Sequence, residues 1–196
     1  MKTKYRVLVL FAHPALQKSR VNRMMIEQIR SLEGIQFHDL YEAYPEFDIN
    51  VSYEQDLIEA NDVIVLQHPF FWYSTPAIIK EWLDLVLQHN WAYGSKGNAL
   101  HDKTIMHAIT TGGRESAYDE QGLNRYTVRQ FLRPLEQTAR LCGMNFLPPF
   151  IVHGTHQMVP DEIARHAAEY REIIIALRDG QINFSAVSDY PRINLT

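Results

Sequence analysis

The sequence predicts an α/β fold in which a five-stranded parallel sheet, in the order 2-1-3-4-5, carries helices on both faces and so forms three layers. Short apolar runs alternate with amphipathic helical patterns between about residues 5 and 178. Right-handed crossovers leave few other arrangements for such an alternation. The composition, 46% hydrophobic and 21% charged, is that of an ordinary globular chain. We therefore expect one domain over residues 1–196, with its core over about residues 5–178.

The elements of the first half follow from the spacing of apolar residues. Residues 5–12 form a run with almost no polar interruption, which predicts a central strand covered on both faces. A helix should follow the N-cap Ser19 and end before Gly34. The next expected elements are a strand over residues 36–41, a short helix that a capping box at Ser52 and Gln55 begins and that ends at Ala60, and a strand over residues 62–68.

The second half continues the alternation. A hydroxyl cap at Ser74 or Thr75 and a first-turn proline predict a helix with the buried stripe Ile78, Trp82, Leu85 and Val86. The remaining expected elements are a strand over 103–110, one long helix over 128–142, a fifth strand over 145–153 made irregular by Pro148 and Pro149, and a last helix from Pro160. Residues 179–196 lack a long apolar pattern and are expected to form a surface tail.

Composition and charge disfavour several functional classes. A net charge of −4 offers no basic surface for nucleic acid. No apolar run approaches the roughly 18 residues of a membrane span, and the first residues lack a secretory signal pattern. Cys142 is the only cysteine, which excludes an internal disulfide and a cysteine-rich zinc site. We expect a cytoplasmic protein that binds no metal, does not insert into the membrane and has small molecules or proteins as partners.

In sheets of this kind, ligands bind beyond the carboxyl ends of the strands where the strand order reverses. The loop after the first strand contains no glycine, so it lacks the fingerprints of dinucleotide-binding and Walker A loops. It offers a cradle for one phosphate, formed by the hydroxyl of Ser19 and the backbone N–H groups of Arg20, Val21 and Asn22. The same residues are also typical of an ordinary N-cap with a solvated Arg20.

Four consecutive aromatic residues follow the third strand: Phe70, Phe71, Trp72 and Tyr73. They cannot all turn inward from one short loop, so some should be exposed. The exposed rings would form a wall for a flat ring. In the alternative interpretation, two of them are buried at the edge of the sheet and the others make a subunit contact.

The loop after the fourth strand contains Thr110, Thr111, Gly112 and Gly113. Its two glycines let the backbone approach a ligand closely, although a simple glycine turn would look the same. Nearby, Arg114 or Tyr118 would supply a hydrogen-bonding group at the edge of a planar heterocycle. Together the three loops predict a phosphate cradle, an aromatic wall and a glycine edge, which indicates a mononucleotide with a flat tricyclic ring, a flavin.

Longer stretches resemble the flavodoxin-like NAD(P)H quinone oxidoreductases. The motifs that carry this resemblance are Ala12-His13-Pro14, the segment from Ser19 to Asn22, the segment from His68 to Ala77, Trp91-Ala92-Tyr93-Gly94 and Thr110-Thr111-Gly112-Gly113. Within that family the chain is most similar to the ancillary oxidoreductase subunits of glutathione-gated potassium-efflux systems, through the segments 44–50, 99–101 and 147–150. The resemblance covers about residues 5–178.

The resemblance implies a homodimer that binds FMN, or FAD in its place, takes hydride from NADH or NADPH and passes two electrons to a quinone or related electrophile. The residues it assigns to the cofactor are His13 and Ser19 to Asn22 at the phosphate, Phe70 to Tyr73 at the ring and ribityl chain, and Thr110 to Gly113 at the ring edge. Its alternative implication is a regulatory subunit that binds a potassium-efflux transporter at the inner face of the membrane, with catalysis secondary.

Two residues are expected to take part in catalysis. Tyr118 matches the family's tyrosine beside the flavin N1 and O2 region, although a loop tyrosine can also be a bystander. The larger quinone reductases have a histidine six residues further on, where this chain has Asn124. Asparagine donates a hydrogen bond but cannot relay a proton near pH 7, which favours a regulatory role. His153 and His156 are expected to line the mouth of the pocket.

Overall fold

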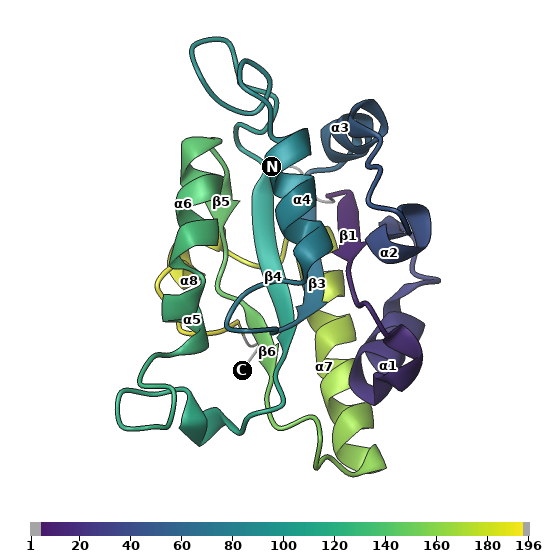
Figure 1. The fold of residues 1–196 in the computed structure, drawn as a ribbon, viewed down its shortest axis with the longest axis vertical. Helices are drawn as coiled ribbons and strands as arrows, with labels where there is room; N and C mark the ends of the chain where they lie inside the picture. Colours follow the sequence, from purple (N-terminus) through teal and green to yellow (C-terminus); the bar gives the residue numbers. More distant parts are fainter. Residues whose placement is uncertain (1–4, 194–196) are drawn as a thin grey trace.

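The computed structural model describes residues 5–193, and its parallel sheet has the predicted strand order β2-β1-β3-β4-β5 (Figure 1). The strands are β1 (Val7–Phe11), β2 (Ile35–Asp39), β3 (Val63–Pro69), β4 (Thr104–Thr110), β5 (Asn145–Phe146) and β6 (Phe150–Val152). The expected fifth strand is divided, because Pro148 and Pro149 lie between β5 and β6, which pair with different parts of β4.

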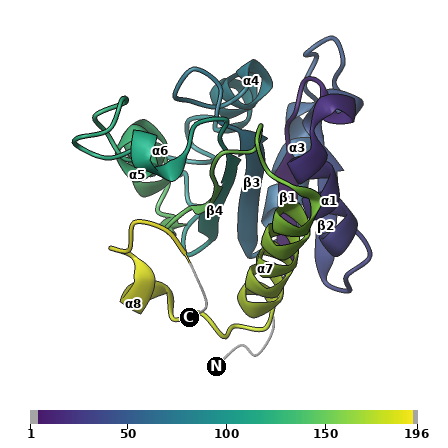
Figure 2. The same ribbon diagram turned by 90° about the horizontal axis from the view of Figure 1, so that it is seen from below.

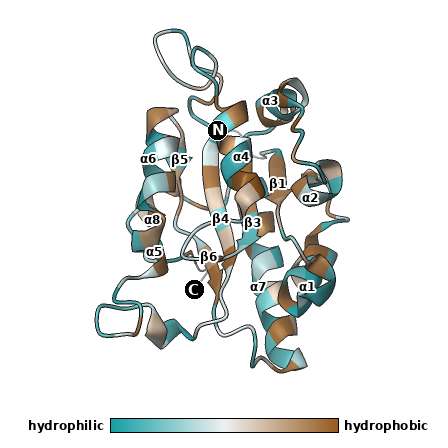
Figure 3. Cartoon of the chain, in the orientation of Figure 1, coloured by the Kyte–Doolittle hydropathy of each residue, from teal (hydrophilic) through white to brown (hydrophobic). Residues whose placement is uncertain are grey.

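Helices cover both faces of the sheet, as the views in Figures 1 and 2 show. On one face lie α1 (Arg20–Ile29) and α7 (Pro160–Arg178), and on the other α2 (Leu40–Ala43), α3 (Val51–Ala60), α4 (Ala77–Val86) and α6 (Arg133–Leu141). The side chains of β1 alternate, with Val7 and Val9 in the first core and Leu8 and Leu10 in the second. Figure 3 shows the resulting concentration of apolar residues in the strands. No helix within residues 5–193 is both long and apolar enough to span a membrane.

The long helix predicted over residues 128–142 is two helices. It is divided into α5 (Val128–Phe131) and α6, with Leu132 between them. Pro134 causes the break, because it has no N–H to donate and its ring clashes with the carbonyl four residues earlier. The turn lets α5 pack Val128 against Ile109 and Ile151, close to the lower end of the sheet in Figure 1.

Two predicted helix caps are wrong. The N-cap of α3 is Asn50, whose side chain accepts a hydrogen bond from the Tyr53 N–H at 3.1 Å. A capping box at Ser52 does not form, because the Gln55 side chain donates instead to the carbonyl of Val86 at 3.0 Å.

Helix α4 begins at Ala77 with Pro76 at the N-cap position, and Pro76 has no side-chain group that could cap it. Ser74 lies in the preceding turn, where its backbone pairs with that of Phe71. Its buried stripe uses Ile79, while Leu85, predicted to be buried, is 37% exposed.

The predicted surface tail after residue 179 is partly buried. It contains α8 (Phe184–Val187), and the ring of Phe184 lies 5.9 Å from that of Tyr5. Ile193 is 2% exposed and its N–H donates to the carbonyl of Pro149 at 3.0 Å. Apolar residues too sparse to form a helical pattern therefore still cover the first core. Residues 194–196 of the tail lie outside the described residues.

A buried carboxylate joins α3 to β2 and α4. Glu54 is fully buried and accepts hydrogen bonds from His38 Nε2 at 2.7 Å, the Tyr44 hydroxyl at 2.6 Å and Trp82 Nε1 at 2.8 Å. Burial by itself would raise the pKa of Glu54, but the three hydrogen bonds outweigh it and the pKa is lowered. Glu54 therefore stabilises the fold as a carboxylate.

Replacing this carboxylate by an amide tests its contribution. We expect Glu54→Gln to lower the free energy of unfolding by about 2–3 kcal/mol at pH 7, because charge-assisted hydrogen bonds are lost in a buried site. The folded-state pKa lies below the unfolded value, so the difference from wild type should shrink as pH falls below about 4. Urea unfolding measures the free energy of unfolding of each variant, with Glu27→Gln at an exposed position as control. Equal losses of stability in the two variants would show that the buried carboxylate does not stabilise the fold.

Candidate functional site

A cavity of about 380 Å³ lies at the carboxyl ends of β1, β3 and β4, within the size range of small-molecule sites. Its wall includes eight of the residues predicted for a cofactor: His13, Ser19, Arg20, Val21, Phe70, Phe71, Thr110 and Gly112. The other lining residues are Lys18, Pro69, Thr155 and His156. The three loops that sequence analysis singled out therefore meet at one cavity, together with the loop between β6 and α7.

The N-terminus of α1 forms the polar end of the cavity. Ser19 is the N-cap, as predicted, and its hydroxyl accepts from the Asn22 N–H at 3.3 Å. The first N–H groups of a helix have no partner within it, and the helix dipole makes this end positive. Lys18 and Arg20 add two cationic side chains, and Arg20 also donates to the carbonyl of Thr155 at 3.4 Å. This end of the cavity is suited to an anion.

A buried hydrogen-bond network lies beneath that helix end. The Asn22 amide nitrogen donates to Ser19 Oγ at 3.1 Å and to Thr110 Oγ1 at 3.0 Å. Its oxygen accepts from Gln67 Nε2 at 3.2 Å, and Gln67 Oε1 accepts from the Tyr170 hydroxyl at 3.0 Å. Asn22 is 1% exposed, so it supports the cavity from behind its wall. The network ties α1, β3, β4 and α7 together at the site.

The aromatic loop divides its four rings between two environments. Phe70 and Phe71 line the cavity, whereas Trp72 is 92% exposed and Tyr73 is 48% exposed. Trp72 and Tyr73 have φ values of 50° and 62°, and reciprocal backbone hydrogen bonds between Phe71 and Ser74 close the turn around them. Left-handed backbone costs about 1 kcal/mol or more for such residues. The loop thus holds two strained, outward-facing aromatic residues.

Asn124 contacts this loop and not the cavity. Its Oδ1 accepts a hydrogen bond from the Tyr73 hydroxyl at 3.2 Å. The Tyr73 ring stacks on that of Phe131, with 5.0 Å between the ring centroids. The two residues support each other at the surface. Tyr73 and Asn124, predicted for the cofactor and for catalysis, therefore lie together outside the cavity wall.

The glycine loop brings backbone close to the cavity. A Cβ on Gly112 would lie 2.5 Å from His156 Nε2, so a side chain there would collide with the opposite wall. Thr111 is turned away from the cavity: its hydroxyl donates to the carbonyl of Gly113 at 2.8 Å and accepts from His153 Nδ1 at 3.0 Å. Of the two histidines expected at the pocket mouth, His156 lines the cavity and His153 lies behind it.

Tyr118 packs behind the glycine loop. A Cβ on Gly113 would lie 3.0 Å from the Tyr118 ring. The centroid of this ring lies 6.0 Å from that of Phe70 and 5.4 Å from that of His153. Burial raises the pKa of Tyr118, although the hydroxyl of Thr111 acts in the opposite direction. Tyr118 therefore keeps its proton at neutral pH and can donate it in a hydrogen bond.

His13 is oriented as a neutral donor. Its Nδ1 accepts from the Ala15 N–H at 3.0 Å, which leaves the ring proton on Nε2. The ring lies between Phe11 and Phe71, and burial lowers the pKa of His13. His13 thus brings an N–H group, without a charge, to the wall of the cavity.

Several residues of the site are not among those predicted from the sequence. Lys18 directly precedes the predicted N-cap, so its position in that loop was an available signal. Gln67 and His68 are the polar residues of a strand that is otherwise apolar, which is typical of buried hydrogen-bonding groups. Tyr170 lies on the buried face of α7, and only the fold shows that its hydroxyl reaches Gln67. Within residues 5–193, no three His, Cys, Asp or Glu side chains form a group that could hold a metal ion.

A family model described as the flavodoxin-like fold matches residues 5–174. The chain belongs to this flavodoxin-like family. A relative in Salmonella newport, the glutathione-regulated potassium-efflux system ancillary protein KefG, is 45% identical over 172 residues, covering 88% of this chain and 94% of the relative.

Two solved structures of flavodoxin-like relatives are also similar. General stress protein 14 of Treponema denticola, in complex with FMN, is 37% identical with a TM-score of 0.84, covering 88% of this chain and 99% of that one. An NADPH-quinone reductase from P. pentosaceus is 30% identical with a TM-score of 0.78, and the match covers 86% of this chain and 96% of that one.

The Asn22 network predicts a specific loss of stability. Asn22→Ala leaves Gln67 Nε2 without its buried acceptor, so we expect the free energy of unfolding to fall by about 2–3 kcal/mol. The control is Asn98→Ala at an exposed position, which should change stability by less than about 0.5 kcal/mol. Thermal unfolding compares them. A loss no larger for Asn22 than for Asn98 would show that the network does not stabilise this end of the sheet.

Proposed function

We propose that the protein is an FMN-dependent oxidoreductase that takes two electrons from NADH or NADPH and delivers them to a quinone or related electrophile. The observation that carries the proposal is the cavity itself, in which an anion-binding helix N-terminus faces a glycine edge and two aromatic rings. The FMN complex of the Treponema denticola relative and the NADPH-quinone reductase relative support this assignment.

The residues present fit FMN. The phosphate would bind the N–H groups at the start of α1, with Lys18 and Arg20 beside it. The flat ring would lie against Phe71 and along the backbone of Gly112, where a Cβ would collide with His156. FAD is the alternative cofactor, and chromatography of the released flavin distinguishes the two.

Bound FMN would accept a hydride from the nicotinamide and then release two electrons to the acceptor. The task of the chain is to hold the cofactor and to donate hydrogen bonds where negative charge develops. Tyr118 does not line the cavity, but its hydroxyl lies beside Gly113 and keeps its proton at neutral pH, so it would act at the glycine edge of the ring. Asn124 would act indirectly, by holding Tyr73 at the surface.

Anaerobic titration tests the proposed activity. The purified protein should show a flavin absorption spectrum, and NADH or NADPH should bleach it at about one equivalent of nicotinamide per flavin. Addition of a quinone should restore the absorption. A protein that binds no flavin after incubation with FMN, or whose flavin is not bleached by either nicotinamide, would contradict the proposal.

A second candidate function is regulation of a potassium-efflux transporter. It is favoured by the 45% identity to the KefG ancillary protein. In that case the protein would act at the cytoplasmic face of the membrane by binding the transporter, with catalysis secondary. Co-purification with the transporter, in the presence and absence of FMN, tests this role. Failure to co-purify under both conditions would leave the oxidoreductase activity as the better explanation.

We also propose a homodimer. Four large side chains beside the site are exposed by about half or more: Trp72, Tyr73, Leu123 and Tyr126. Burial of these four side chains against a second copy of the chain would remove apolar surface from water and so favour a dimer. Light scattering tests the assembly, and a monomer at micromolar concentration with full activity would contradict it.

Changing the N-cap tests the phosphate cradle. Ser19→Glu introduces a carboxylate at the helix end where we expect the phosphate, so repulsion between like charges should abolish FMN retention. The matched control is Ser95→Glu in an exposed loop, which should purify with wild-type flavin content. Flavin absorbance per protein measures the effect, and circular dichroism checks the fold. A Ser19→Glu protein that retains its full flavin content would refute the cradle.

Removing one hydroxyl tests Tyr118. Tyr118→Phe keeps the ring contacts with Phe70 and His153, so flavin content should stay near wild type. Loss of a donor that stabilises developing charge should slow flavin reduction by about 10- to 100-fold, equivalent to about 1.4–2.7 kcal/mol. Stopped-flow reduction by NADH measures the rate. An unchanged rate would assign the stabilisation to other groups of the site.

A further inference from the structure

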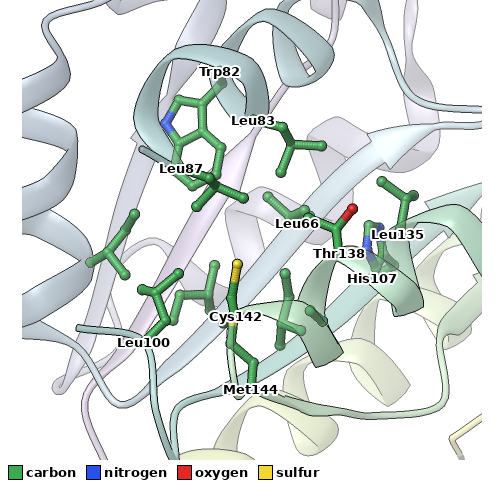
Figure 4. Close-up of a pocket in the computed structure, with 14 residues that line it drawn as sticks. Leu66, Trp82, Leu83, Leu87, Leu100, His107, Leu135, Thr138, Cys142 and Met144 are labelled. Atoms are coloured by element: carbon green, nitrogen blue, oxygen red, sulfur yellow. The ribbon is translucent and has the colours of Figure 1, made fainter. Parts of the chain in front are cut away.

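A second hollow lies between the sheet and helices α4 and α6, on the face opposite α7 (Figure 4). Its inner part measures about 30 Å³, room for one or two water molecules, and its wall is almost wholly apolar. Figure 4 shows Trp82, Leu83 and Leu87 across the hollow from Cys142. Leu83, Leu87 and Cys142 also line a wider groove of about 410 Å³ between the two helices.

One polar atom in this wall has no partner. His107, on β4, is fully buried, and no group within residues 5–193 forms a hydrogen bond with its Nε2. Thr138 also lines the hollow, but its hydroxyl proton is used in a bond to the carbonyl of Pro134 at 3.0 Å. A bare buried nitrogen is unusual, because buried polar groups almost always find a partner.

Neighbouring hydrogen bonds determine which form this nitrogen takes. The carbonyl of Pro69 can only accept, so His68 Nδ1 donates to it at 2.9 Å. His68 Nε2 is then the acceptor in its 3.1 Å contact with His107 Nδ1, which carries the proton. His107 Nε2 is left with a free lone pair.

Both imidazoles stay neutral. Burial lowers the pKa of His68 to about 4 and lowers the pKa of His107 well below its ordinary value. The positive charge of Arg129 acts in the same direction on His107. His107 Nε2 is therefore an acceptor throughout the neutral pH range.

We propose that this hollow and the adjoining groove form a binding site for small aromatic molecules that carry one hydroxyl group, with the hydroxyl donating to His107 Nε2. The apolar wall excludes ions, because a charge there would lose its hydration without compensation. A water molecule would be poorly stabilised there, because it needs two or more polar partners. A phenol satisfies the single acceptor with its hydroxyl in the inner hollow, and its ring lies toward Leu83, Leu87 and Cys142, where the hollow adjoins the groove.

Phenol and toluene provide matched probes, because they differ only by a hydroxyl in place of a methyl group. NMR titration of the full chain, with labelled histidine nitrogens, follows each probe. Phenol should move the Nε2 resonance of His107 and the amide resonances of Thr138 and Cys142. Toluene should move the amides and leave the nitrogen nearly unchanged. A nitrogen that does not respond to saturating phenol would overturn the proposal, as would shifts confined to the first cavity.

Two variants test separately the acceptor atom, His107 Nε2, and the space in the inner hollow. In His107→Phe the preference for phenol over toluene, as a ratio of dissociation constants, should fall by about tenfold. In Thr138→Leu the added side chain fills the hollow, so both probes should bind at least about fivefold more weakly while the histidine pair stays intact. An unchanged ratio in the first variant, or unchanged affinities in the second, would overturn the proposal. If His107→Phe does not fold, the wild-type nitrogen titration and Thr138→Leu decide.

Discussion

The amide of Asn22 is the interaction on which the candidate site depends. It is buried, and its nitrogen and oxygen are bonded to Ser19, Thr110 and Gln67. An unpaired amide at this depth would be costly, so the three bonds fix the start of α1 relative to β3 and β4. The start of α1 and the glycine edge therefore keep a constant separation. Tyr170 extends this constraint to α7 through Gln67.

The carboxyl end of β3 organises both faces of the sheet. Gln67 and His68 are neighbours, so their side chains point to opposite faces. Gln67 joins the network under the first cavity, while His68 bonds to His107 beside the apolar hollow. Pro69, the next residue, lines the first cavity, and its carbonyl accepts a hydrogen bond from His68 Nδ1. Three consecutive residues thus support both the first cavity and the apolar hollow.

Sequence patterns predicted the fold and the loops of the site, but not how the side chains divide within them. Alternating strand and helix periods were sufficient for the strand order, and the cap at Ser19 is a local signal. Trp72 and Tyr73 turn outward because a turn of left-handed backbone closes their loop. Such a turn is not predictable from the sequence here, because residues other than glycine seldom adopt this conformation. The burial of Ile193 depends on contacts between segments far apart in the chain. Such contacts leave no periodic trace in the sequence.

In the proposed flavin complex, the start of α1 holds the phosphate group. Titration of the flavin-free protein with FMN and with riboflavin tests it most directly, because the two ligands share the ring and ribityl chain and differ in the phosphate. FMN should bind at least about 100-fold more tightly than riboflavin, equivalent to about 2.7 kcal/mol, and added salt should narrow this difference in affinity. Equal affinities for FMN and riboflavin would contradict it.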